Sequence, residues 1–443
     1  MSNPSTCSPL RPSRPRPSLR PSLLGVLGLF ACSPPAASPS VSLRSATPSE
    51  VATVTLGRGT TCAATLTGQA KCWGHRDGGR LGNGTAAAGF ETDPSDLPPL
   101  ELGDEVDAIV TNGDQSFALL ADGRVRAFGL NDAGQLGLGH TETIGDDETP
   151  TMADVATIVP LAGGATQLAA GEGFACARLL DGRVQCWGRG DDGQLGRGAL
   201  TGIQPPGDVV LGGSAMELAA GAAHACARLE TGAVRCWGRG DHGQLGYGTT
   251  ATSSGLPAAA GDVPLGGAAV QITAGAAHTC ALLDTGAIRC WGDNAGGQLG
   301  LGHTQSVGDD ETPAQAGDVP VGGLVDSVAA GLRHTCAVLT DGQLRCWGDD
   351  TLGPLGLSPQ QTIGDDELPL DAPPVDFQGL AVEAVFAGPL ASHTCARLDG
   401  GDLRCWGLGD RGQLGLGFVN PQDPVEGPPG DLPDVIIVED PDL

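Results

Sequence analysis

Two short apolar runs on either side of a glycine-containing turn recur along most of this chain. One copy comprises Cys280–Leu283 and Ile288–Trp291, which flank the turn Asp-Thr-Gly at residues 284–286. Short apolar runs separated by such a turn are typical of a β-hairpin. A glycine-rich corner, Gly292–Gly302, follows the second run, and its glycines suit positive φ values or close backbone packing. The pattern therefore predicts a repeated unit built on an antiparallel hairpin.

The aromatic residue of this unit gives the number of copies. It occurs at intervals of 55, 59, 50, 54, 56 and 59 residues, at Trp73, Phe128, Trp187, Trp237, Trp291, Trp347 and Trp406. A corner of the form Gly-x-Leu-Gly follows each copy, at Gly79–Gly82, Gly134–Gly137, Gly193–Gly196, Gly243–Gly246, Gly297–Gly300, Gly353–Gly356 and Gly412–Gly415. All six tryptophans therefore occupy one repeat position, and the chain contains seven repeats.

The signature of the repeat resembles that of a known family. The repeat has Ala-Gly-x-x-His, then Ser or Thr, then x-Ala-Leu, and after a turn it continues with Trp-Gly and Gly-Gln-Leu-Gly. This signature is similar to the regulator of chromosome condensation repeat, and it extends over residues 50–440. The resemblance implies an all-β fold, a seven-bladed β-propeller with four antiparallel strands in each blade. Repeats of this length with short strands and glycine turns independently favour radial blades that pack mainly on their neighbours. We therefore expect one propeller over residues 50–443.

The first 49 residues have a different composition. Arginines precede an apolar run, Leu23–Ala31, which is too short to span a bilayer and is typical of a signal peptide. The end of this run resembles a bacterial lipoprotein signal, so we expect residues 1–31 to be removed and Cys32 to be lipidated. Ordinary secretion with cleavage nearby is the alternative. Residues 32–49, rich in proline and serine, are predicted to form a disordered linker. Both readings place the protein outside the cytoplasm, either anchored in the cell envelope or secreted.

Twelve cysteines form six sets with the same spacing: Cys62 with Cys72, Cys176 with Cys186, Cys226 with Cys236, Cys280 with Cys290, Cys336 with Cys346, and Cys395 with Cys405. The second repeat has Phe117 and Ala127 at these positions, so both cysteines are missing together. Opposed residues of an antiparallel hairpin lie about 4.5–5.5 Å apart at Cα, within reach of a disulfide. We predict six disulfides, each within one blade, which agrees with export. Buried free thiols in a reducing cell are the alternative, and the absence of Cys-x-x-Cys disfavours zinc.

The charge of the chain limits its partners. The net charge is −28, and loss of residues 1–31 with their four arginines changes it to −32. The only lysine is Lys71. Nucleic acid and anionic membrane surfaces normally bind basic patches, so we expect neither as a partner, and membrane contact only through the lipid. A soluble monomer whose charge prevents aggregation is the simplest interpretation, and attraction of a basic partner is the alternative.

Two sets of residues are candidate metal ligands. Four repeats place a histidine two residues before the first cysteine: His224, His278, His334 and His393. These imidazoles could surround a metal, or each could hydrogen-bond within the structure. Three repeats carry a Gly-Asp-Asp-Glu loop, within residues 140–150, 303–313 and 361–369. Its oxygens suit calcium, although adjacent carboxylates more often form a solvated turn. We expect neither a metal nor another cofactor.

No catalytic constellation is recognisable. The sequence has no nucleophile elbow, phosphate-binding loop or His/Glu zinc spacing. The family's founding activity is guanine-nucleotide exchange, but it depends on surface elements that have no counterpart here. Another branch comprises secreted bacterial propellers that inhibit β-lactamases. We interpret the chain as a non-catalytic binding or scaffold module for an unknown protein or cell-surface ligand. Exchange activity, enzyme inhibition, and a hydrolase or lyase using the central channel are the alternatives.

Two further predictions concern particular positions. Asn112 stands five residues before the first cysteine position, where most repeats have glycine, so we predict a positive φ there. The connectors after the corners, such as Thr85–Leu97, Ala199–Pro206 and Thr249–Ala260, vary in length and chemistry. Because variable loops on a rigid scaffold are where binding usually occurs, we expect recognition at the rim that these connectors form.

Overall fold

The computed structural model describes residues 51–85, 88–151, 157–199, 201–253, 255–419 and 428–437. The predicted signal peptide, the linker and the candidate lipidation site Cys32 lie outside these residues. All described residues belong to a single unit, Ala46–Leu443. No helix in the described ranges is long and apolar enough to cross a membrane.

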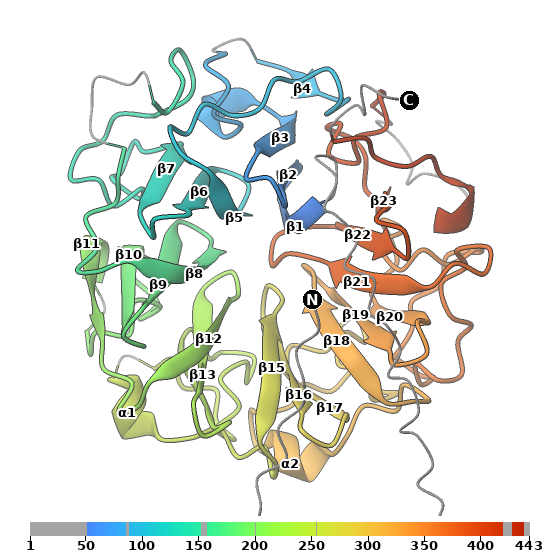
Figure 1. Cartoon of the computed structure of the whole chain (residues 1–443). Coiled ribbons are helices and arrows are strands. Elements are labelled where there is room, and N and C mark those ends of the chain that lie inside the picture. The colour runs from blue at the N-terminus through green and yellow to red at the C-terminus, as the bar shows by residue number, and fades with distance from the viewer. Residues whose placement is uncertain are drawn as a thin grey trace, which may run out of the picture. The chain divides into compact units, whose positions relative to one another are not determined.

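Seven antiparallel β-sheets surround a common axis, and each sheet comes from one repeat (Figure 1). The innermost strands of blades 1 to 7 are β1 (Val51–Gly57), β5 (Val106–Thr111), β8 (Ala165–Gly171), β12 (Ala215–Ala220), β15 (Ala269–Ala274), β18 (Val325–Ala330) and β21 (Val382–Phe386). The middle strands are β2 (Thr60–Thr65), β6 (Gln115–Leu120), β9 (Phe174–Leu179), β13 (His224–Leu229), β16 (His278–Leu283), β19 (His334–Leu339) and β22 (His393–Leu398). The third strands are β3 (Ala70–His75), β7 (Val125–Gly129), β10 (Val184–Gly190), β14 (Val234–Gly238), β17 (Ile288–Gly292), β20 (Leu344–Gly348) and β23 (Leu403–Gly407).

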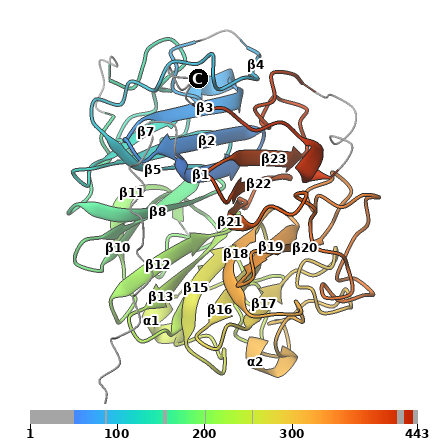
Figure 2. The same ribbon diagram turned by 45° about the vertical axis from the view of Figure 1, so that its right-hand side comes forward.

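Each innermost strand contacts the innermost strands of both neighbouring blades, and β21 contacts β1. The predicted seven-bladed propeller is therefore confirmed. Figure 2 shows β12, β15 and β18 following one another around the axis. Inner and third strands end on the same face, which we call the corner face because it carries the Gly-x-Leu-Gly corners. The opposite face carries the hairpin tips, such as residues 284–286, and is called the turn face.

Among the residues described, the expected fourth strand is found in two of the seven blades. Only β4 (Phe90–Glu91) and β11 (Thr201–Val209) add a fourth strand, and the other five sheets have three strands in the residues described. There an extended connector makes isolated hydrogen bonds to the third strand, such as Val263 N–H to the Val234 carbonyl (2.8 Å). Prolines beside these contacts, such as Pro264, cannot donate to a ladder, so the strand does not continue. Short helices in the connectors are α1 (Pro257–Ala260), α2 (Pro313–Ala316) and two 3-10 turns, Asp77–Gly79 and Pro429–Asp431.

The six expected disulfides join the middle and third strands of their blades. They link Cys62 to Cys72, Cys176 to Cys186, Cys226 to Cys236, Cys280 to Cys290, Cys336 to Cys346, and Cys395 to Cys405, which are the pairs expected from the spacing. The two cysteines of each pair lie directly opposite one another in the strand register.

One feature of these disulfides differs from the expectation. The Cα atoms of the six pairs are 4.0–4.1 Å apart, closer than the 4.5–5.5 Å expected for opposed residues. In blade 2, Phe117 and Ala127 are opposed in the same way, and Phe117 packs edge-on against Trp187 of blade 3. Apolar packing therefore takes the place of the missing disulfide.

In the part of the chain that the structure describes, the ring closes through contacts between blades 1 and 7, and no sheet contains strands from both ends of the chain. Arg397 of blade 7 donates to the backbone carbonyl of Val51 (2.8 Å), and Trp73 Nε1 donates to the carbonyl of Gln413 (3.0 Å). Apolar side chains of blades 1 and 7 form one buried cluster around Trp73. Val435, near the end of the described chain, pairs with β23 of its own blade (2.7 Å). Each blade is therefore one contiguous segment.

The glycine five residues before the first cysteine is needed for close packing, and not for its φ. Gly275 has an ordinary φ, but an added Cβ would lie 2.0 Å from Cε1 of His278 and 2.4 Å from the carbonyl oxygen of Gly331 in the next blade. Asn112 also lacks a positive φ, so that prediction is wrong. Its amide instead donates to the carbonyl of Gly171 in the next blade. The close approach of neighbouring blades therefore restricts this position.

Candidate functional site

A hydrogen-bonded latch between neighbouring blades uses most residues of the repeat signature. Between blades 5 and 6, Nε2 of His278 lies 3.0 Å from the hydroxyl of Thr335, which donates to the backbone carbonyl of Gln298 (2.9 Å). Trp347 Nε1 donates to the same carbonyl (3.0 Å). Because the hydroxyl proton is directed to the carbonyl, Nε2 of the histidine donates the hydrogen bond to the hydroxyl. The histidine and the corner belong to blade 5, and the threonine and tryptophan belong to blade 6.

The same latch recurs at three further interfaces, between His224 and Thr279 (2.9 Å), His334 and Thr394 (2.9 Å), and His393 and Thr61 (2.8 Å). Where a blade has another residue in place of histidine, the next blade can lack the threonine. Phe174 is matched with Ala225, and Gln115 with Ala175. The histidine of one repeat and the threonine of the next therefore vary together, a signal that is visible in the sequence once the blades are paired.

The latch histidines are neutral structural groups. Each is at most 1% exposed, and burial lowers the pKa of His224, His278 and His393 to about 3 and that of His334 to about 4. In the described chain, the groups of three or more possible metal ligands within 4.8 Å of one another contain no histidine. Each imidazole is directed to its own interface, so the four do not converge on one site. Their recurrence is explained by packing between blades.

The Gly-Asp-Asp-Glu loops pack against the Gly-x-Leu-Gly corner of the preceding blade. In blade 6, Gly364 has a φ of +98°, and its backbone lies against Gly297 and Gly300 of blade 5, where a side chain would collide. The N–H of Gly302 donates to the carbonyl of Gly364 (3.1 Å). Gly145 and Gly308 occupy the same place on blades 1 and 4. The glycine of the loop is therefore structural, and the carboxylates beside it are displayed on the corner face.

The carboxylates of each loop crowd together. Their oxygens lie within 4.8 Å of one another in Asp146, Asp147 and Glu148, in Asp309, Asp310 and Glu311, and in Asp365, Asp366 and Glu367. Desolvation and the neighbouring aspartates raise the pKa of Glu148 and Glu311 to about 7, and the pKa of Glu367 is also raised. Crowding of like charges favours protonation of one carboxylate in each loop. Calcium binding by these loops is only the alternative to a solvated turn, and the expectation that they hold no metal stays a prediction from the sequence.

Connectors of successive blades touch one another around the outside of blades 4 to 6. The N–H of Ala258 in α1 donates to the carbonyl of Val210 (3.0 Å), and that of Ala314 in α2 donates to the carbonyl of Pro264 (3.1 Å). Leu370 makes the equivalent contact with Pro320 (3.1 Å). The connectors therefore form a rim that begins on the corner face and crosses the outer edge of the blades, and its composition differs from blade to blade.

Two profiles of the regulator of chromosome condensation (RCC1) repeat match this chain. The first covers residues 165–194, 217–244, 269–298, 325–353 and 382–413, and the second covers 181–228, 231–282 and 286–338. Together with the seven-bladed architecture, these matches define the class of protein. The chain belongs to the RCC1 repeat family, as its sequence predicts.

Relatives in this family differ widely in size. The ultraviolet-B receptor UVR8 of Arabidopsis thaliana is 29% identical over 356 residues, which cover 80% of this chain and 76% of UVR8. The mouse E3 ubiquitin-protein ligase HERC2 is 28% identical over 355 residues, which cover 79% of this chain but only 7% of HERC2. Among solved structures, Prp20p of Saccharomyces cerevisiae has a TM-score of 0.64 at 21% identity, covering 88% of this chain and 87% of Prp20p. Human WBSCR16 has a TM-score of 0.62 at 20% identity, covering 77% and 86%.

Proposed function

We propose that this chain is an exported, non-catalytic propeller that binds a protein through the connector rim of its corner face. The observation that carries the proposal is the contrast between blades and connectors. The recurrent features of the repeat are used within the fold, in disulfides and latches, whereas the connectors differ in length and chemistry. Variable loops on a rigid scaffold are the usual place for recognition. The four histidines that recur in the repeat are buried and engaged with neighbouring blades.

Protein binding also agrees with the relatives. Prp20p has been described with binding properties toward Gsp1p and histones. E3 ligases such as HERC2 extend far beyond the segment that matches this chain, so their activity does not transfer with it. Export is supported by six disulfides, which persist in oxidising compartments. Guanine-nucleotide exchange requires a cytosolic chain, and cell fractionation therefore separates it from our proposal.

Neutralising the corner-face loops should weaken capture of the partner. The test uses the oxidised propeller as bait on the envelope fraction of the source cell, with recovered proteins identified by mass spectrometry. The triple variant Asp147→Asn, Asp310→Asn, Asp366→Asn removes one charge from each loop and should lose a protein that the parent recovers. A control, His278→Phe with Thr335→Ala, reproduces the pair Phe174 and Ala225 of this same chain and should capture normally. Loss of capture in the control alone would contradict binding through the corner-face loops.

Substitution of Cys32 tests the anchor separately. We propose that Cys32 carries a lipid that holds the propeller at a membrane. Cys32→Ser should therefore abolish acylation and release the folded propeller into the soluble exported fraction. Metabolic labelling with a fatty acid and fractionation measure the two effects. Membrane association that is unchanged in this variant would contradict the lipid anchor while leaving the binding rim untouched.

A further inference from the structure

Carboxylates without ionic partners gather on the turn face of blades 4 to 7. Five of them lie in the hairpin tips and one near the start of β18: Glu230, Asp284, Asp341, Asp399, Asp402 and Asp326. All six are exposed, and none forms an ion pair within the part of the chain that the structure describes. The sequence-based interpretation does not single out these residues, because each looks like an ordinary turn residue of its own repeat.

Arginines in the same sector do not neutralise these carboxylates. Arg289 pairs with Asp318 of the adjacent connector (2.8 Å), and the corresponding arginines of blades 4 and 7 make equivalent pairs (2.7 and 2.9 Å). In blade 6, Arg345 donates instead to the backbone carbonyls of Pro369 (2.9 Å) and Ala372 (2.6 Å). The turn face of this sector therefore keeps a surplus of negative charge.

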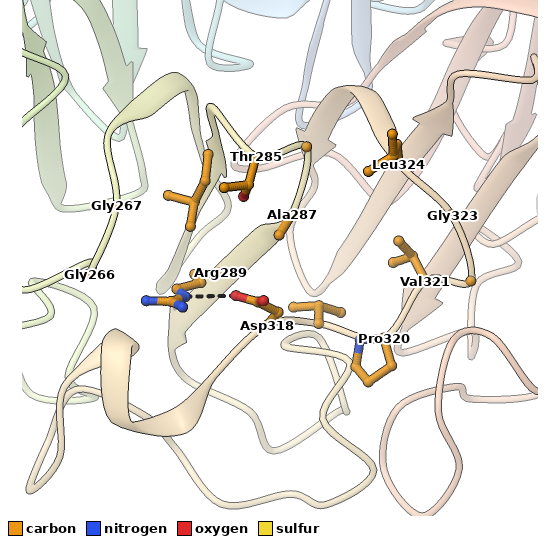
Figure 3. Close-up of a pocket in the computed structure, with 14 residues that line it drawn as sticks. Gly266, Gly267, Thr285, Ala287, Arg289, Asp318, Pro320, Val321, Gly323 and Leu324 are labelled. Carbon is orange, nitrogen blue, oxygen red and sulfur yellow. Dashed lines mark hydrogen bonds and ion pairs between the residues drawn. The ribbon is translucent and has the colours of Figure 1, made fainter.

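Two hollows, each with an exposed leucine, lie beside the acidic tips. Figure 3 shows the hollow at the interface of blades 5 and 6, with Thr285 and Leu324 on one side and the ion pair of Arg289 and Asp318 on the other. It has a volume of about 430 Å³, and Leu324 is 60% exposed. A second hollow of about 450 Å³, at the interface of blades 6 and 7, contains Leu380, which is 46% exposed. Exposed leucines of this kind are available to a ligand.

We propose that the turn face of blades 4 to 7 docks a cationic segment of a partner polypeptide. Lysine or arginine side chains would pair with the tip carboxylates, and aliphatic side chains between them would enter the two hollows. Charge complementarity favours this occupant, since opposite potentials attract and like potentials repel. A second copy of this chain would bring two acidic faces together, and nucleic acid or anionic lipid would be repelled. The tip carboxylates lie on the face opposite the Gly-Asp-Asp-Glu loops, so the inference goes beyond the proposed function.

Binding of a defined peptide tests the proposal. The probe is a fluorescent peptide of repeating Lys-Leu-Ser units, with one matched peptide in which glutamate replaces lysine and another in which serine replaces leucine. The oxidised propeller should bind the first peptide, more weakly at high salt because salt screens exposed charges. It should bind the serine-substituted peptide more weakly and the glutamate-substituted peptide not at all. Fluorescence anisotropy measures each dissociation constant.

Matched variants locate the site. Asp284→Asn, Asp326→Asn and Asp341→Asn together should weaken binding by about tenfold, the product of three modest surface ion pairs. The corner-face variant Asp147→Asn, Asp310→Asn, Asp366→Asn has the same charge change and should alter binding by less than about twofold. The double variant Leu324→Ser, Leu380→Ser should bind the Lys-Leu-Ser peptide more weakly than the parent does. Its affinity for the serine-substituted peptide should be unchanged. An equal loss of peptide affinity in the two triple Asp→Asn variants would overturn the proposal. Sedimentation that shows a dimer formed through this face would also overturn it. The corner-face capture experiment is unaffected by either outcome.

Discussion

Reduction of the six disulfides is expected to abolish the folded propeller. Each disulfide closes a short hairpin loop and should contribute about 3 kcal/mol in the chain-entropy treatment, or about 18 kcal/mol for the six. This exceeds the whole stability of a typical domain, about 5–15 kcal/mol. The sulfurs are buried, so the protein should be reduced in denaturant and then refolded with and without oxidant. Near-ultraviolet circular dichroism of the tryptophans should recover only in the oxidised sample.

A single blade allows a finer comparison. Replacing Cys280 and Cys290 with alanine should lower the free energy of unfolding by about 3 kcal/mol, because the cross-link is lost. Replacing Cys280 with phenylalanine and Cys290 with alanine copies blade 2, where Phe117 and Ala127 occupy these positions. This variant should lose less unfolding free energy than the alanine pair, because the phenylalanine ring can pack against the neighbouring blade. Urea unfolding measures both variants. Full recovery of native signal by the reduced parent would contradict the structural role of the disulfides and would reopen a cytosolic location.

Acid should destabilise the propeller steeply below pH 6.5. The folded pKa of His224, His278 and His393 is about 3 and that of His334 about 4, so the folded chain binds fewer protons than the unfolded chain, whose histidines titrate near 6.5. The stability that these groups contribute is complete above pH 6.5 and is lost as the pH falls toward 4. Each histidine contributes about 1.4 kcal/mol per pH unit, so the four together reach about 5.5 kcal/mol per unit.

Carboxylates act in the opposite direction over part of this range. Glu148 and Glu311 have a folded pKa raised to about 7, so their protonation below pH 7 favours the folded state. Both belong to solvent-exposed loops, where screening reduces the effect, and the histidines should therefore dominate. Unfolding free energies measured by urea titration at a series of pH values give the slope.

The variant His278→Phe with Thr335→Ala provides the control for this experiment. It removes one titrating group and installs the pair found at Phe174 and Ala225, so the interface should remain packed. The slope of unfolding free energy against pH between 4 and 6 should fall by about one quarter, because one of the four histidines that take up a proton on unfolding has been removed. Thr335→Ala alone leaves the Nε2 hydrogen of His278 unpaired in a buried position, which should cost about 1–3 kcal/mol at neutral pH. A slope identical to that of the parent would show that other groups control acid unfolding.

Sequence periodicity alone predicts the number of blades, the position of each hairpin and the cysteine pairing. These features are local. Cys280 and Cys290 are close because the turn at residues 284–286 reverses the chain between them, and the spacing repeats in every blade that has cysteines. A pattern with a fixed period also specifies a repeat architecture, because each unit can bury its faces only against its neighbours.

The partners of the other motif residues required the tertiary structure. His278 meets Thr335, which lies 57 residues further along the chain, because the rotation between blades brings the two repeats together. The same rotation places the carbonyl of Gly331 against Gly275, and for that reason packing, and not φ, restricts this position and Asn112. Among the residues that the structure describes, five sheets have three strands, and prolines such as Pro264 cannot extend the ladder, a detail that the family resemblance does not show.

The candidate binding surfaces depend most on the three-dimensional arrangement. Asp284 and Asp341 are ordinary turn residues when each repeat is taken alone, and Leu324 is one apolar residue before a strand. Only the ring places an acidic tip of one blade beside the exposed leucine of the next, since the contact between Gly286 and Leu324 joins two repeats. Residue spacing within a repeat determined the blades, whereas the surfaces between blades are determined by the angle at which successive repeats pack, which no single repeat contains.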